Sequence, residues 1–79
     1  MKAKVYVSYK DGVLDPQGLA VKNAISSMGY EGVEEVRQGK YFEINLKDLP
    51  SPDADKLIKE ISEKILANPI IEKFEYRLE

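Results

Sequence analysis

The chain has 79 residues, of which 43% are hydrophobic and 33% are charged, and its net charge is -2. This length suits a single small domain over residues 1–79. The slightly acidic charge argues against general nucleic-acid binding. The chain has no Cys and no His, which excludes disulfides, ordinary zinc sites and thiolate or imidazole catalysis. A domain this short needs further stabilisation, so we expect a homodimer or a higher oligomer.

No apolar run approaches the roughly 20 residues that cross a membrane. The N-terminal stretch MKAKVYV lacks the apolar segment of a secretory signal. We therefore expect a cytoplasmic protein with no membrane partner.

The first predicted element is a strand over residues 2–9. Ala3, Val5 and Val7 alternate there with Lys2, Lys4 and Tyr6, and a period of two with β-branched residues is typical of a half-buried strand. Lys10-Asp11-Gly12 ends it.

A helix follows in the stretch VLDPQGLAVKNAISSMGY. Asp15 can cap its N-terminus, and Pro16 suits its first position. Leu14 and Leu19 occupy the positions of a hydrophobic staple, and Gly29 suits the left-handed residue that closes the helix. One helix face carries Val21, Ala24, Ile25 and Met28.

Starting a helix explains neither Gln17 nor Gly18. Glycine costs roughly 1 kcal/mol relative to Ala inside a helix, but it lets another backbone approach closely. We expect Asp15, Gln17 and Gly18 to contact the second copy or a larger partner. The alternative is close packing of this helix within its own chain.

Two strands are predicted next, a weak one in VEEVRQ (33–38) and a clear one in KYFEINL (40–46). Gly39 between them suggests a hairpin. Arg37 and Lys40 flank Gly39 and could bind an anion or a carboxylate of a partner. The alternative is a charged hairpin tip that keeps a sheet edge soluble.

A second helix is predicted in LPSPDADKLIKEISEKILANP. Ser51 or Asp53 can cap it, and Asn68-Pro69 ends it. Its apolar stripe is formed by Leu57, Ile58, Ile61 and Ile65, and a last strand carries Phe74, Tyr76 and Leu78. The order is βαββαβ, which predicts an α+β two-layer sandwich with two helices on one face of an antiparallel sheet.

The residues offer little catalytic chemistry. Neither GxxxxGK[ST] nor GxGxxG occurs in the sequence, so no phosphate-binding loop of either kind is present. We expect no catalytic, metal-binding or cofactor-binding residue in this chain.

Several motifs resemble the small PurS-type subunit of phosphoribosylformylglycinamidine (FGAM) synthase. They are a first strand ending in Lys10, then VLDPQG opening a helix, then MGY, then VRQGKYFE. The likeness runs from about Lys4 to Leu46.

The resemblance implies a non-catalytic assembly subunit of an ATP- and glutamine-dependent ligase of de novo purine biosynthesis. In that enzyme a glutaminase subunit releases ammonia, and a large synthetase subunit binds ATP and magnesium and aminates formylglycinamide ribonucleotide. The small subunit, as a homodimer, bridges the two. The contact residues that we expect are Asp15, Gln17, Gly18, Arg37, Gly39 and Lys40.

A hypothesis of another class also fits the residues. Small βαββαβ domains often dimerise and bind metabolites between subunits, so the chain could be a small dimeric metabolite-binding regulatory module. Binding to a synthetase and a glutaminase separates the first hypothesis from the second.

Overall fold

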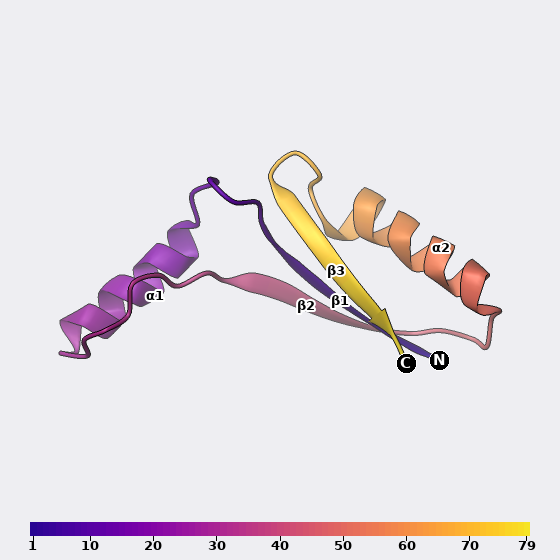
Figure 1. The fold of residues 1–79 in the computed structure, drawn as a ribbon, viewed down its shortest axis with the longest axis horizontal. Helices are drawn as coiled ribbons and strands as arrows, with labels where there is room; N and C mark the ends of the chain where they lie inside the picture. Colours follow the sequence, from indigo (N-terminus) through magenta and orange to yellow (C-terminus); the bar gives the residue numbers. More distant parts are fainter.

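The computed structural model describes residues 1–79 and has three strands and two α-helices, which alternate along the chain (Figure 1). The predicted α+β class is confirmed. None of the helices combines the length and the apolar character that a membrane span requires. The elements are β1 (Lys2–Tyr9), α1 (Pro16–Ser27), β2 (Gly39–Asn45), α2 (Ser51–Ile61), a π-helical turn (Ser62–Leu66) and β3 (Glu72–Leu78).

The sheet has the order β2-β1-β3, and both neighbouring pairs are antiparallel. Val5 at its centre lies opposite Phe42 on β2 and Tyr76 on β3. The predicted alternation therefore places the apolar residues of all three strands on one face. Ala3, Val5 and Val7 are fully or almost fully buried there.

α2 covers this apolar face over β1 and β3. Ile58 of α2 and Ala67, which follows the π-helical turn, are buried in one cluster with the apolar residues of β1. The hydroxyl of Tyr76 on β3 donates a hydrogen bond to the carboxylate of Asp55 on α2, at 2.6 Å. The core is small, because only 9 of the 79 residues are buried.

The apolar stripe predicted for the second helix is right in its first part and wrong at its end. Ile58 is buried, but Ile65 is 75% exposed, and Leu66 packs against the core instead. The π-helical turn at Ser62–Leu66 explains the difference. Its wider i→i+5 winding shifts the following side chains around the axis relative to an α-helix.

The strand predicted over residues 33–38 is wrong, and so is the hairpin at Gly39. Residues 31–38 form no ladder, and Gly39 is the first residue of β2. Val33 and Val36 are not spaced for one strand face, so no alternating pattern drives pairing there. The segment instead runs back along α1 (Figure 1).

The two predicted helices do not share one sheet face within the chain. α1 lies beyond the end of the sheet, alongside the segment that leads into β2 (Figure 1). The molecule is consequently elongated, with extents of 51 × 24 × 15 Å and a radius of gyration of 16.1 Å. A compact chain of this length has a radius of gyration of about 12 Å. We call the projecting segment, residues 10–38, the arm.

Candidate functional site

Asp15 joins the two sides of the arm near its base. One carboxylate oxygen, Oδ1, accepts a hydrogen bond from the backbone N–H of Gly18 at 2.8 Å, which caps α1 as predicted. The other, Oδ2, accepts from the backbone N–H of Gln38 at 2.7 Å. A single side chain therefore caps the helix and also binds the segment that returns to the sheet.

The charge of Asp15 is stabilised by these contacts. The N–H of Gln38 and then the N–H of Gly18 hold the pKa of the Asp15 carboxyl below its ordinary value, and the nearby Arg37 guanidinium acts in the same direction. Burial of the group opposes them. Asp15 is thus an ionised carboxylate that is only 9% exposed, and hydrogen-bonding its oxygens is what makes that burial tolerable.

Gly18 is buried because the backbone of its own chain lies against it. A Cβ at this position would clash with the carbonyl oxygen of Val36 and would lie 2.9 Å from Oδ2 of Asp15. The close approach expected from the sequence is therefore made within the chain, at the point where Val36 passes α1. A contact of Gly18 with a partner stays a prediction.

Gln17 and Arg37 reinforce the same junction. Oε1 of Gln17 accepts a hydrogen bond from Nε2 of Gln38 at 2.9 Å. Arg37 donates to the carbonyl oxygens of Tyr9 at 2.9 Å and Lys10 at 3.2 Å. Its guanidinium also lies 3.4 Å from the Glu35 carboxylate. Arg37 thereby ties the end of β1 to the returning segment.

Gly39 and Lys40 lie in β2, next to this junction but in the sheet. A Cβ on Gly39 would lie 2.6 Å from the carbonyl oxygen of Val7, so glycine permits the close pairing of β2 with β1. The ammonium of Lys40 is 3.5 Å from the carboxylate of Glu72 on β3. The structure therefore gives each of these two residues a role within the sheet.

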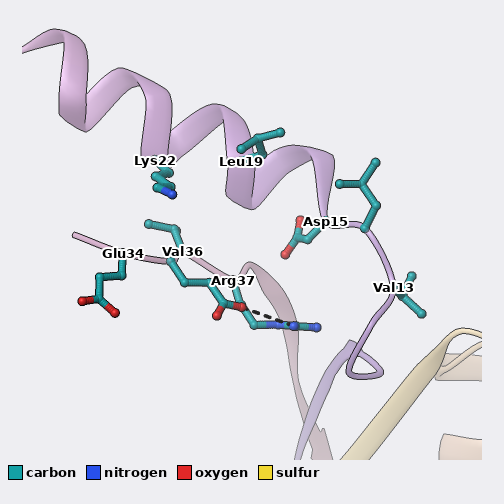
Figure 2. A pocket seen from close by; sticks show the side chains of 9 residues that line it. Val13, Asp15, Leu19, Lys22, Glu34, Val36 and Arg37 are labelled. Carbon is teal, nitrogen blue, oxygen red and sulfur yellow. Dashed lines mark hydrogen bonds and ion pairs between the residues drawn. The ribbon is translucent and has the colours of Figure 1, made fainter.

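A pocket of about 200 Å³ opens at the base of the arm. Figure 2 shows Asp15 at the start of α1, with its carboxylate turned toward the segment that carries Val36 and Arg37. Of the six candidate residues, only Asp15 and Arg37 line it. Its other lining residues are Val13, Leu14, Leu19, Lys22, Glu34, Glu35 and Val36.

A larger groove of about 560 Å³ lies between β3 and the end of the π-helical turn, and none of the candidate residues lines it. The structure has no group of three or more His, Cys, Asp or Glu residues placed to hold a metal ion.

The sequence predicted Asp15 as a helix cap but missed its second partner. Gln38 lies 23 residues further along the chain, and no local pattern links a helix cap to so distant a backbone N–H. Both residues do lie in motifs singled out above, VLDPQG and VRQGKYFE. The structure shows that these two motifs meet at the base of the arm.

Comparison with known proteins identifies these motifs with a family. The family model for PurS, described as phosphoribosylformylglycinamidine (FGAM) synthase, matches residues 2–79. The chain belongs to the PurS family. It is therefore a subunit of FGAM synthase, an enzyme of purine biosynthesis, and this favours the subunit hypothesis over a regulatory module.

Individual PurS proteins agree with the family match. The PurS subunit of Bacillus subtilis is 51% identical over 78 residues, which cover 99% of this chain and 92% of that protein. One crystal form of B. subtilis PurS superimposes with a TM-score of 0.89 at 51% identity, covering 99% of this chain and 96% of the other.

More distant PurS structures keep the same fold. PurS of Methanocaldococcus jannaschii, one of the subunits of formylglycinamide ribonucleotide amidotransferase, has a TM-score of 0.88 at 32% identity, covering 99% of this chain and 94% of the other. A chain of PurLQS from Thermotoga maritima has a TM-score of 0.86 at 26% identity, covering 96% and 93%.

Proposed function

We propose that this chain is the non-catalytic assembly subunit of its FGAM synthase. In this proposal it acts as a homodimer that bridges the glutaminase and synthetase subunits, so that ammonia passes between them without loss to solvent. The observation that carries the proposal is that the candidate side chains make contacts within the chain and form no catalytic group. Asp15, Gln17, Arg37 and Lys40 all bind other parts of the chain, as expected of a scaffold.

The likeness to a chain of PurLQS supports the proposed partners. In the proposal, the large synthetase subunit binds ATP and magnesium, and this chain holds neither. We further propose that the chain forms one PurS-like domain over residues 1–79. Its place in purine biosynthesis supports a cytoplasmic location.

The surface area supports the homodimer. The chain exposes 5913 Å², whereas a compact protein of 9.0 kDa exposes about 4,900 Å². The excess of about 1,000 Å² is larger than the roughly 800 Å² that each partner buries in a standard interface. A second copy is a suitable occupant because the chain itself carries two uncovered apolar surfaces.

The first uncovered surface is on α1, where Val21 is 42% exposed and Met28 is 75% exposed. The second is on β2, where Phe42 and Ile44 are only half-buried because α2 lies over β1 and β3. We place α1 of one copy over β2 of the other. Each sheet then receives the second helix that the βαββαβ pattern predicted, and two-fold symmetry makes the exchange reciprocal.

The opposite sheet face stays open in such a dimer. Tyr6 and Tyr41 lie there with their ring centroids 4.9 Å apart, and they are 46% and 47% exposed. Lys2 and Lys4 extend the face and pair with Glu43 and Glu79. Tyrosine is enriched at protein interfaces, and the rims of interfaces are polar, so we propose this face for docking the larger subunits.

Reconstitution of the enzyme tests the proposal. The chain is mixed with purified synthetase and glutaminase subunits, and FGAM formation is measured with glutamine and, separately, with ammonium chloride. We expect the chain to raise the glutamine-supported rate and to form a complex with both subunits, with no glutaminase or ATPase activity of its own.

Two results would overturn the proposal. One is turnover of glutamine or ATP by the chain alone. The other is full glutamine-supported activity of the two large subunits without it. A metabolite that raises the melting temperature of the chain, with no binding to either subunit, would favour a regulatory module instead.

A further inference from the structure

The arm contacts the rest of the chain at few places, so the contacts at its base determine how it is held against the sheet. α1 is 12 residues long, and its apolar side chains are largely exposed. An isolated helix of this length is marginal in water. The position of α1 relative to the sheet therefore depends on contacts at the base of the arm.

Asp15 joins three backbone segments at the base of the arm. Its backbone continues from β1, its Oδ1 holds the first turn of α1 through Gly18, and its Oδ2 holds the returning segment through Gln38. The Gln17–Gln38 and Arg37 contacts beside it are all on exposed groups. Exposed contacts of this kind contribute little to holding a geometry, whereas N–H bonds to an ionised oxygen are strong, and those of Asp15 are buried at Gly18 and partly buried at Gln38.

We propose that Asp15 is a positioning residue for assembly: its bond to the Gln38 N–H sets the direction in which the arm presents α1. This inference rests on the proposed function. Without the bond, the helix still has its cap, but the two sides of the arm separate at the base. The arm then samples several directions, and the fraction of molecules ready to assemble falls.

The substitution Asp15→Ser separates the cap from this second bond. A serine hydroxyl is a good helix cap and can accept from the Gly18 N–H, but its single short side-chain oxygen cannot also reach Gln38. The matched control is Asp53→Ser, which makes the same change in the first turn of α2, where Asp53 is exposed.

Three measurements are made on wild type and on both variants. Amide hydrogen exchange measures how well the Gly18 and Gln38 N–H groups are protected from solvent. Sedimentation reports the dissociation constant of the dimer. Reconstitution with both large subunits reports the ratio of the glutamine-supported rate to the ammonium-supported rate.

We expect Asp15→Ser to keep Gly18 protected and to speed exchange at Gln38. Its dimer should weaken, and its rate ratio should fall, by about tenfold each, which corresponds to about 1.4 kcal/mol. Asp53→Ser should match wild type in all three measurements. The rate ratio is compared under conditions where circular dichroism shows each variant to be fully folded, because a loss of folded chain would lower the ratio as well.

Fast exchange at Gln38 with an unchanged dimer and an unchanged rate ratio would overturn the proposal. If the variant fails to fold, Asp15→Asn serves instead, because it keeps one acceptor oxygen. If wild type does not raise the glutamine-supported rate, the proposed function fails, and the dimer dissociation constant alone decides whether Asp15 positions the arm.

Discussion

Gly18 and Asp15 lie three residues apart, and each is matched to the segment that returns along α1. The carbonyl oxygen of Val36 fills the space that a side chain at position 18 would need. The N–H of Gln38, two residues further on, meets the Asp15 carboxylate. The VLDPQG motif therefore starts the helix and also binds the backbone of the VRQGKYFE motif.

Gly18→Ala should destabilise the isolated chain. The added methyl clashes with backbone, which cannot rotate away as a side chain can, so we expect a loss of about 1–3 kcal/mol, as for overpacking. Urea denaturation followed by circular dichroism measures it. Asn23→Ala on the exposed side of α1 is the control and should be neutral or slightly stabilising. A more stable Gly18→Ala variant would show that the arm opens freely in solution.

The contribution of Asp15 to stability should depend on pH. Its native pKa lies below the ordinary 3.8, so its full contribution is present above that value. The contribution is lost as the pH falls through the lowered native pKa. We therefore expect Asp15→Asn to melt below wild type at neutral pH, and the two melting temperatures to converge in acid. A difference that stays constant with pH would contradict this linkage.

At the scale of elements, α2 and its π-helical turn form the part of the chain that packs most clearly on the sheet. Ser62, the first residue of the turn, is fully buried, and its hydroxyl has no hydrogen-bond partner. The turn brings Leu66 against the core and leaves Ile65 outside. The polar residue at position 62 and the apolar one at 65 are thus both placed against their usual preference.

The turn can be tested with a pair of substitutions. Leu66→Ala should lower the free energy of unfolding by roughly 1–3 kcal/mol, because it removes side-chain volume that packs on the core. Ile65→Ala should change it by less than about 0.5 kcal/mol. Chemical denaturation of both variants at one protein concentration compares them. The reverse order of the two costs would mean that a regular α-helix continues to Leu66.

The elements differ in how far their sequence determines them. The strands at Ala3–Val7 and Phe74–Leu78 were predicted correctly, because apolar and polar residues alternate there and the structure buries or half-buries the apolar ones. Asp15, Pro16 and Gly29 marked the ends of α1 by capping chemistry alone, and Gly29 indeed has a positive φ of 87°. The π-helical turn was missed because no local residue pattern encodes it. The direction of the arm was missed because it depends on the long-range bond from Asp15 to Gln38.

At the scale of the whole molecule, two uncovered apolar surfaces complement one another. α1 has exposed apolar residues and no sheet beneath it, while β2 has half-buried apolar residues and no helix above it. Within one chain the two surfaces are kept apart by the elongated shape, 51 Å in its longest dimension. Burying both in a symmetric dimer adds apolar contacts without any change of fold.

A cross-linking experiment tests this arrangement, and the absence of native Cys leaves the introduced thiols as the only ones. A variant with Val21→Cys on α1 and Ile44→Cys on β2 is treated with a short bis-maleimide. We expect a product of twice the chain mass, because the proposed dimer places α1 of one copy on β2 of the other. The control, Val21→Cys with Lys59→Cys on the exposed side of α2, should stay largely monomeric in mass. Equal cross-linking of both variants would place the interface elsewhere. Independently, a folded monomer at micromolar concentration in sedimentation would mean that α1 is stable without a second copy.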